Sequence, residues 1–351
     1  MPTITRLTMR AATRRARQWD AEAAEEGDSA APKKQLVFEV SKRALAMELA
    51  AACGDSAAQI LWDIEHFYDA VDIEGLAEDV ECYNFPREVA GLAMQAHAGT
   101  RRLKLEGCFS KEIASTARGI LAGCSSSTSL ARLTMLGPLR FAQTKGVTAA
   151  VHVDDVSQTT IASTATEVKT KSCQAGKDFI DRVASKGLTI AKKSTVVATS
   201  VQLARQIAKE FAKAGVTLQV QAATVDLGVG TKPGRRTSST IRLRLQAGLS
   251  RASRISALRS QAARATKLFQ TGCFAACSFG HQVGGMSPTQ RDQLDRCARK
   301  CAGSFGLRPC PRTSTALSIR GLAKYEGAGA ANRHVVFAMG NGVARSKGSD
   351  P

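Results

Sequence analysis

The chain has 351 residues, of which 44% are hydrophobic and 23% are charged, as in a globular protein of two or three domains. No apolar run approaches the ~20 residues of a membrane-spanning helix, so the sequence excludes a transmembrane protein. The net charge of +19 is uneven, because residues 1–230 carry 28 Lys/Arg and 26 Asp/Glu whereas residues 231–351 carry 21 and 4. Such an excess favours a polyanionic partner, nucleic acid in the first place, over a merely solvated basic face.

Residues 1–35 are polar and contain few large apolar side chains, so we expect a flexible lead-in. The first residues are rich in arginine and have no acid before Asp20, which resembles a transit peptide. A disordered basic arm and the ragged start of a fragment are the alternatives.

The hydrophobic pattern between residues 36 and 230 alternates between helical and strand-like periods. In the first half we predict a helix over 36–53, a strand turning into a helix over 59–71, two helices separated by Pro86 and a short hairpin with Gly107 in its turn. A Gly/Ser-rich loop entering an apolar helix follows over 117–142, and then a hairpin over 146–163. The second half is predicted as a long helix up to 187, a strand pair over 188–200, a helix over 201–215 and strands up to 230. Few of these units have the length of a βαβ crossover. The sequence therefore predicts an α+β fold with an antiparallel sheet rather than a doubly wound one.

Two adjacent aspartates, Asp154 and Asp155, lie between the two β-prone runs of "GVTAAVHVDDVSQTTIAS". They have two interpretations, because aspartate favours hairpin turns and because carboxylates are the natural ligands of Mg²⁺. Asp63 follows another buried strand, where an ionised carboxylate costs several kcal/mol unless it is paired or metal-bound. Capping of the following helix is the alternative role for Asp63. On neighbouring strands, the three carboxylates would converge and hold two divalent ions, as in nucleotidyl transfer.

Five segments resemble motifs of reverse transcriptases, in the order and at the spacing of that family. "DIEHFYDAV" resembles the first catalytic motif, "RGILAGCSSST" the glycine-containing second motif and "VHVDDV" the Asp-Asp hairpin. "KGLTIAKKSTVVATS" is similar to the lysine-containing segment that follows, and "VDLGVG" to the step before the thumb. The resemblance covers residues 55–230 and is closest to the non-LTR retrotransposon type. It implies a polymerase palm followed by a mostly helical, basic, thumb-like region.

The resemblance also implies roles for individual residues. Asp63, Asp154 and Asp155 match the metal-binding carboxylates, and Lys193, or its neighbour Lys192, matches the lysine that protonates pyrophosphate. The implied cofactor is Mg²⁺, as two ions, with Mn²⁺ as a substitute.

A second group of residues matches positions at the nucleotide and the template. Tyr68 matches the aromatic gate that excludes ribonucleotides, and its alternative role is that of a packed aromatic. Arg118, Gly119 and Gly123 match the loop under the template base, where glycine permits a close backbone approach.

Several positions depart from the family pattern. Ala122 replaces the glutamine of the second motif, and Ser125 and Thr128 replace its prolines. Only about 60 residues, mostly low in hydrophobicity, precede Asp63, so we interpret the chain as a fragment that lacks most of the fingers.

The basic tract after residue 231 contains a helix-prone stretch in which leucines and isoleucines alternate with arginines. We expect Leu245, Leu249, Ile255 and Leu258 to pack inward. The side chains expected to follow nucleic-acid phosphates are Arg235, Arg236, Arg244, Arg251, Arg254 and Arg264.

Ten cysteines are scattered along the chain, and we expect them to be reduced thiols. One group, Cys273, Cys277, Cys297 and Cys301, has i, i+4 spacing within each pair. A zinc site and small buried hydrophobes are the two interpretations, and the CxxC spacing of zinc knuckles is absent.

The expected organisation is a lead-in over 1–35, a reverse transcriptase palm with partial fingers over 36–230, a thumb-like region over 231–310 and an unassigned tail over 311–351. The expected function is RNA-directed DNA polymerase of a retrotransposon, with RNA template, DNA primer and dNTPs as partners and, by the resemblance, a nuclear location. The alternatives are an inactive nucleic-acid-binding remnant and a viral RNA-dependent RNA polymerase, which Tyr68 disfavours.

Overall fold

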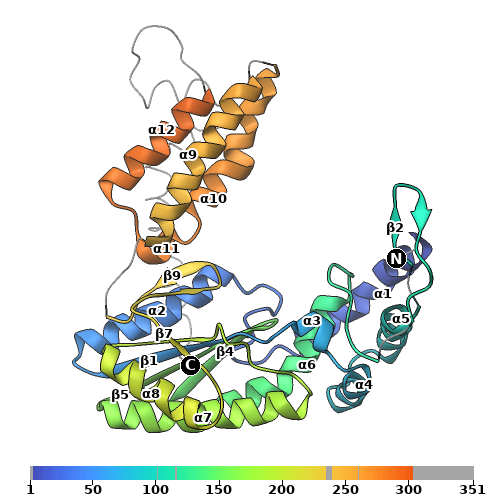
Figure 1. Ribbon diagram of the computed structural model, residues 1–351, viewed down its shortest axis with the longest axis horizontal. Helices are drawn as coiled ribbons and strands as arrows, with labels where there is room; N and C mark the ends of the chain where they lie inside the picture. Colours follow the sequence, from blue (N-terminus) through green and yellow to red (C-terminus); the bar gives the residue numbers. More distant parts are fainter. Residues whose placement is uncertain (1–2, 101, 115–116, 235–238, 260, 303–351) are drawn as a thin grey trace, which may run out of the picture. The chain divides into compact units, whose positions relative to one another are not determined.

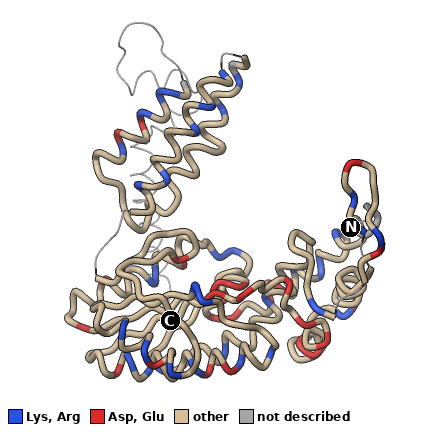
Figure 2. Tube along the Cα trace, in the orientation of Figure 1, with Lys and Arg blue, Asp and Glu red and all other residues tan. Residues whose placement is uncertain are grey.

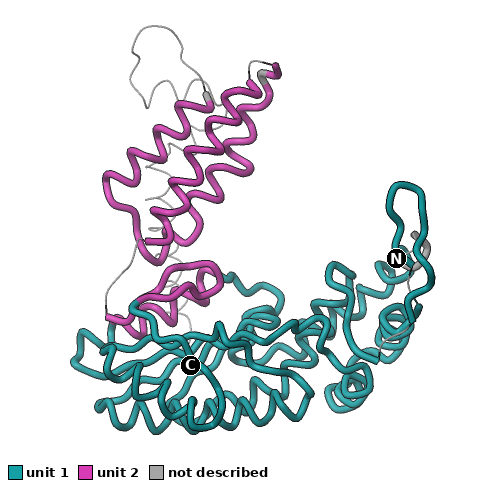
Figure 3. Tube along the Cα trace, viewed as in Figure 1, with its two compact units in different colours: residues 1–36, 49–222 teal, residues 37–48, 223–351 magenta. Residues whose placement is uncertain are grey.

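The computed structural model describes residues 3–100, 102–114, 117–234, 239–259 and 261–302. The chain forms two compact units (Figure 3). Unit 1 comprises residues 1–36 and 49–222, and unit 2 comprises residues 37–48 and 223–351.

Unit 1 is built on a five-stranded sheet with the strand order β4-β5-β1-β6-β7 (Figure 1). Its strands are β1 (Ser56–Trp62), β4 (Val147–His152), β5 (Asp155–Ala162), β6 (Thr195–Ala198) and β7 (Gln219–Val220). All neighbours are antiparallel except β6 and β7. β1 pairs with β5 on one side and β6 on the other, so its backbone hydrogen bonds are made on both sides and most of its residues are buried.

Three helices pack against the sheet, and Figure 1 shows α7 and α8 on the same face. They are α6 (Ser127–Ala142), α7 (Ala165–Ser185) and α8 (Val201–Lys213). Trp62 packs between them, with ring centroids 5.8 Å from Phe179 of α7 and 5.3 Å from Phe211 of α8. A Cβ on Gly176 would lie 2.4 Å from the Phe211 ring, so this glycine lets α7 and α8 approach closely.

The amide of Gln158 on β5 ties the sheet to these helices. Its Oε1 accepts from Trp62 Nε1 at 2.7 Å, and its Nε2 donates to Ala142 O and Ala175 O, both at 3.0 Å. A shift of β5 relative to β1 would break the bond to Trp62, and a shift of β5 relative to α6 and α7 would break the other two.

The N-terminal residues form an ordered part of unit 1, which differs from the flexible lead-in expected over 1–35. Helix α1 (Thr3–Glu22) buries Met9, Ala16 and Trp19 in the core. It packs against α5 (Arg87–Ala98), and α4 (Ile73–Cys82) lies next to α5. The Trp19 ring lies edge-on to Phe85 at 4.9 Å, and its Nε1 donates to Tyr83 O at 2.9 Å. A few apolar residues at helical spacing thus outweigh the polar composition of the segment.

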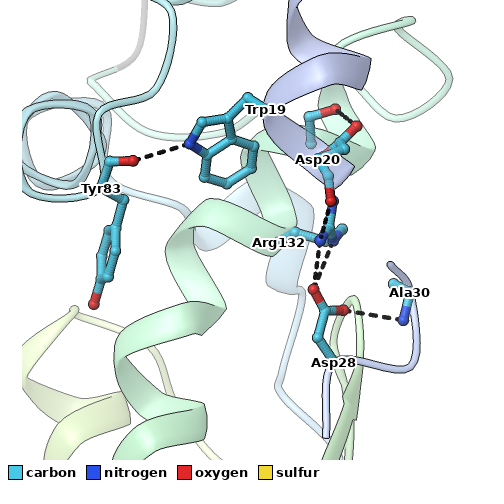
Figure 4. A network of polar contacts seen from close by, with 7 residues as sticks. Trp19, Asp20, Asp28, Ala30, Tyr83 and Arg132 are labelled. Carbon is cyan, nitrogen blue, oxygen red and sulfur yellow. Dashed lines mark hydrogen bonds and ion pairs between the residues drawn. The ribbon is translucent and has the colours of Figure 1, made fainter. Parts of the chain in front are cut away.

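A buried ion-pair network anchors the segment that follows α1 (Figure 4). Arg132 of α6 binds both Asp20 and Asp28, with Nε 3.0 Å from Asp28 Oδ2. Next to Asp28, the Ser29 amide donates to Val151 O at 2.8 Å, which places this segment beside β4. Removing water from these charges is costly, so their mutual pairing is required for burial.

The remaining short elements of unit 1 are α3 (Phe67–Ala70), β2 (Lys104–Leu105) and β3 (Cys108–Phe109). The β2–β3 hairpin turns at Gly107, as predicted. The strand pair predicted over 188–200 is wrong in its first half. Only β6 is a strand there, and residues 188–194 form a loop in which Ile190 makes an isolated bridge to Ile64.

Unit 2 contains most of α2 (Leu36–Ala52), a hairpin and a group of helices. The hairpin strands are β8 (Thr224–Asp226) and β9 (Val229–Thr231), and the helices are α9 (Ser239–Arg259), η1 (Ala263–Thr266), η2 (Phe269–Phe274), α10 (Ala275–Ser278), α11 (His281–Gly284) and α12 (Pro288–Ala302). Arg43 of α2 holds Asp226 of β8 through two hydrogen bonds of 2.9 and 3.0 Å. The hairpin therefore belongs with α2 and unit 2, whereas the sequence placed its residues at the end of the palm.

The predicted α+β fold is confirmed, with a largely antiparallel sheet covered by helices and a helical region after it. Within the described ranges, no helix has both the length and the apolar composition needed to cross a membrane. The tail over 311–351 lies outside the described residues.

Candidate active site

Asp63, Asp154 and Asp155 lie at the same edge of the sheet. β1 ends at Trp62, which pairs with Val156 of β5, so Asp63 follows directly opposite Asp155. Asp155 begins β5 and pairs with His152, and Asp154 lies in the turn between β4 and β5. The convergence expected for neighbouring strands is therefore present.

The conformation of the hairpin turn does not require its two aspartates. The left-handed residue of the turn is Val153, with φ 63°. A β-branched side chain is strained in this region, where Asn, Asp or Gly would be at ease. Asp154 takes the second loop position, which hairpin turns also favour for aspartate, whereas Asp155 already belongs to β5. Turn propensity therefore accounts for at most one of the two aspartates, and a role of the carboxylates accounts for both.

The loop after α7 brings a cation to Asp63. Lys193 Nζ lies 2.9 Å from Asp63 Oδ1, and the lysine side chain is 71% exposed. The loop is held by backbone and side-chain bonds, because Ala191 N donates to Asp63 O at 2.8 Å and Asp63 N donates to Ser194 Oγ at 3.1 Å. The sequence did not mark Ser194 as a residue that holds Asp63. Its position directly after Lys192 and Lys193 was the only feature that could have pointed to it.

The electrostatics of the site reflect this convergence. The hydrogen bond to Asp63 and its charge, with smaller contributions from Asp155 and Asp154, raise the pKa of Lys193. Burial and the charge of Asp154 raise the pKa of the Tyr68 phenol. All three carboxylates therefore act on one lysine, and the charge of Asp154 reaches the Tyr68 hydroxyl.

Tyr68 and the 117–120 segment are joined through their backbones. Ile120 N donates to Tyr68 O at 2.7 Å, and Gly119 N donates to Val71 O at 2.8 Å. Gly119 has φ +100°, a backbone conformation that side-chain-bearing residues rarely adopt, whereas a Cβ there would make only ordinary contact with the Asp69 backbone at 3.4 Å. Arg118 is exposed beside it.

Gly123 lies apart from this contact. It has φ +82°, and no heavy atom lies within 4 Å of a Cβ built on it. Its loop is anchored to α5 instead, because Leu121 N donates a hydrogen bond to His97 Nδ1 at 3.0 Å. The structure thus brings Arg118 and Gly119 to Tyr68, but Gly123 has open space around it.

The carboxylates partly fit a divalent metal ion. Asp63 Oδ2 is buried and has no hydrogen-bond partner among the described residues, which is the state of an oxygen that awaits a ligand. Asp154 is half-buried and Asp155 is exposed. Within the described ranges, however, no three His, Cys, Asp or Glu side chains stand in metal-binding geometry. Lys193 instead supplies the positive charge at Asp63.

The predicted phosphate-binding arginines have different surroundings. Arg251, Arg254 and Arg264 are exposed, and no acidic residue occurs on α9 (Figure 2). Arg244 is half-buried: it donates to Phe279 O and Gly228 O, and its guanidinium lies over the Phe279 ring, so its contact with phosphates stays a prediction. Arg235 and Arg236 lie outside the described residues.

The inward face of α9 is narrower than predicted. Leu245 and Ile255 are buried, as expected. Leu249 and Leu258 are 36% and 52% exposed, because Gly248 and Ala252 occupy the buried side of the helix. Cys273, Cys277, Cys297 and Cys301 pack against this side as members of a buried hydrophobic cluster.

No protein-family model and no curated protein matches the chain. Among solved structures, the chain is similar to apo telomerase from Candida tropicalis truncated from its C-terminal domain, with 14% identity and a TM-score of 0.46 over 64% of this chain and 44% of that one. It is also similar to Candida tropicalis telomerase in complex with a TWJ fragment of telomeric RNA, with 12% identity and a TM-score of 0.43 over 87% and 56%. A third is an insertion-loop deletion mutant of the RNA-dependent RNA polymerase of a human picobirnavirus, with 12% identity and a TM-score of 0.42 over 87% and 53%. The chain spans about half the length of these structures, and the candidate site rests on its own geometry.

Proposed function

We propose that the chain is the polymerase part of a reverse transcriptase, which transfers deoxynucleotides to a primer 3′ hydroxyl on an RNA template. The observation that carries the proposal is the meeting of Asp63, Asp154 and Asp155 at one sheet edge, with Asp63 Oδ2 buried and unpartnered among the described residues. The motif resemblance to non-LTR retrotransposon enzymes supports the choice of RNA and dNTPs.

The carboxylates would hold Mg²⁺, which would neutralise the negative charge that develops during nucleotidyl transfer. Asp63 and Asp154 are the ligands in this proposal, and Asp155 completes the negative site at the start of β5. Lys193 must move from Asp63 for the metal to bind, and its 71% exposed side chain is free to do so. Its ammonium can then donate a proton to the leaving pyrophosphate.

Tyr68 is proposed to select the sugar. Its ring is half-buried, lies edge-on to Phe67 at 5.6 Å and is held beside the Gly119 loop by the Ile120 hydrogen bond. A ring fixed in this way presents a constant surface to a nucleotide at the carboxylates, so an added 2′ hydroxyl would clash with it.

A second candidate function is nucleic-acid binding without catalysis. The Lys193–Asp63 ion pair favours it, because the lysine neutralises the carboxylate without any metal. The exposed arginines of α9 would give salt-sensitive binding in both cases.

Primer extension on an RNA template with dNTPs and Mg²⁺ tests the proposal. Asp154→Asn keeps the shape of the side chain and removes its charge, so the rate should fall by about 10³-fold, as expected for several kcal/mol of lost transition-state stabilisation. Asp181→Asn is the matched control, since Asp181 is exposed on α7, and it should extend primers at the wild-type rate.

Two outcomes separate the candidates, and a third tests the role of Tyr68. Extension by wild type and by the control, but not by Asp154→Asn, supports the polymerase. No extension by any variant, with binding that weakens between 50 and 200 mM salt by about 10³-fold or more, supports the non-catalytic function. Faster incorporation of rNTPs than of dNTPs by the wild type would contradict the proposed role of Tyr68.

A further inference from the structure

Four buried cysteines form a continuous group of thiols in unit 2. Cys273 and Cys277 lie in η2 and α10, and Cys297 and Cys301 lie in α12. Their exposed fractions are only 2%, 1%, 0% and 0% in that order. Within each pair the spacing of four residues places both side chains on one face of a helix.

The thiols meet across the two helical segments in an antiparallel order. Cys277 Sγ and Cys297 Sγ both lie close to the Cβ position of Gly248, at 2.2 and 3.8 Å. Cys273 and Cys301 shift each other's pKa in opposite directions, and their thiols donate to carbonyls one turn apart on α9. The first cysteine of one segment thus faces the last of the other, which makes two cross-helix rungs.

Helix α9 packs directly against the four thiols. A Cβ on Gly248 would lie 2.2 Å from Cys277 Sγ, so only glycine leaves room for the sulfur. The thiols donate to carbonyls one helical turn apart: Cys277 to Arg244 O at 3.7 Å, Cys273 to Gly248 O at 3.6 Å and Cys301 to Ala252 O at 3.9 Å. The sulfurs are therefore held in register along α9.

The surroundings favour the reactive form of one thiol. Hydrogen bonds from Cys277 and Cys301, with the charge of Arg251, hold the pKa of Cys273 well below its usual range. The thiolate is the nucleophile in thiol–disulfide exchange, so Cys273 is the group that would react first.

We propose that these four residues are a modification site that closes to two cross-helix disulfides, Cys273–Cys301 and Cys277–Cys297. The co-reactant is a low-molecular-weight disulfide such as oxidised glutathione. The Cys273 thiolate attacks one of its sulfurs and releases a glutathione thiolate; Cys301, after losing its proton, attacks the mixed disulfide and releases the second. Each rung gives up two electrons and two protons, and each glutathione disulfide becomes two thiols. The closed rungs staple α12 to the η2–α10 segment.

The test is incubation of the full chain with oxidised glutathione, followed by alkylation of free thiols and peptide mapping. Cleavage after Phe274 separates Cys273 from Cys277, and cleavage after Arg299 separates Cys297 from Cys301. Each possible pairing therefore gives its own cross-linked peptide. We expect the 273–301 and 277–297 peptides. After subtraction of the glutathione added at exposed cysteines, the unalkylated protein should have lost the mass of four hydrogens. Cys53 is exposed, so its glutathionylation shows that the reagent was active.

Two variants sharpen the result. Cys297→Ala should leave the 273–301 rung intact and Cys277 free to be alkylated. Cys173 is a buried cysteine of unit 1, so Cys173→Ala is the matched control and should still form both disulfides. Pairing within a helix, pairing with any other cysteine, or free thiols in all four positions while Cys53 is glutathionylated would overturn the proposal. Stoichiometric zinc that blocks alkylation of the four thiols would also overturn it.

Discussion

The sheet unit and the helices α9–α12 of unit 2 bury different kinds of side chain. Unit 1 buries large aromatic rings, such as Trp62 and Phe179, together with ion pairs such as Arg132 with Asp28. In α9–α12 the described core consists of thiols, small residues and a few aliphatic and aromatic side chains, and its basic side chains are mostly exposed.

The difference teaches how each region can use charge. A sheet fixes side-chain direction along paired strands, so carboxylates at a strand end are held in position despite their repulsion. Helices with small residues at their contacts bring their backbones close together and leave long charged side chains on the outside. The first arrangement fixes a few charged groups at one place, as a catalytic site requires. The second spreads positive charge over a surface, as sequence-independent binding of phosphates requires.

The largest expected loss of stability comes from breaking a buried ion pair of unit 1. Arg132→Ala leaves Asp28 buried without its cation, so the free energy of unfolding should fall by about 3–5 kcal/mol. Arg140→Ala removes an exposed pair with Glu25 and should cost less than about 1 kcal/mol. Urea unfolding followed by tryptophan fluorescence measures both, and equal losses would show that burial of the pair is unimportant.

A smaller loss of stability is expected when the close packing of the helices in unit 2 is disturbed. Gly248→Ala forces a Cβ against Cys277 Sγ and should destabilise the protein by about 1–3 kcal/mol under reducing conditions. Gly272→Ala has no heavy atom within 4 Å of the added carbon and should leave stability unchanged or slightly raised. Thermal unfolding monitored by far-UV circular dichroism compares them; a neutral Gly248→Ala would contradict the packing described above.

The smallest effect is a pH dependence in unit 1. Burial raises the pKa of Asp79 although Lys186 Nζ lies 2.5 Å from its carboxylate. A carboxyl with a higher pKa in the folded state binds protons more tightly there, so the free energy of unfolding falls as the pH rises from the unfolded pKa, near 3.8, through the folded pKa.

Asp79→Asn should therefore flatten this decline, as seen in urea unfolding at a series of pH values from about 4 upward. Asp181→Asn, at an exposed position, should keep the wild-type slope. An unchanged slope for Asp79→Asn would place the titrating group elsewhere.

Much of the fold could be predicted from local patterns. The helices at 36–52, 165–185 and 201–213, and the hairpin that carries Asp154, follow directly from apolar periodicity and turn residues. The lead-in could not be predicted, because Met9, Ala16 and Trp19 are too few to mark a helix until their burial against other helices is known. Residues 188–194 were mistaken for a strand because β-branched residues also suit an extended loop that pairs only once.

By itself, the sequence determined the carboxylates, their order along the chain and the basic charge of the C-terminal part, because residue type and spacing carry that information directly. Only the tertiary structure decided that Asp63 meets Asp155, that Lys193 occupies Asp63 and that Val153, rather than an aspartate, takes the left-handed turn position. It also decided that Arg244 turns to backbone carbonyls and that four distant thiols meet. The physical reason is that strand register and helix packing join residues far apart in sequence, and such contacts depend on burial that no local pattern records.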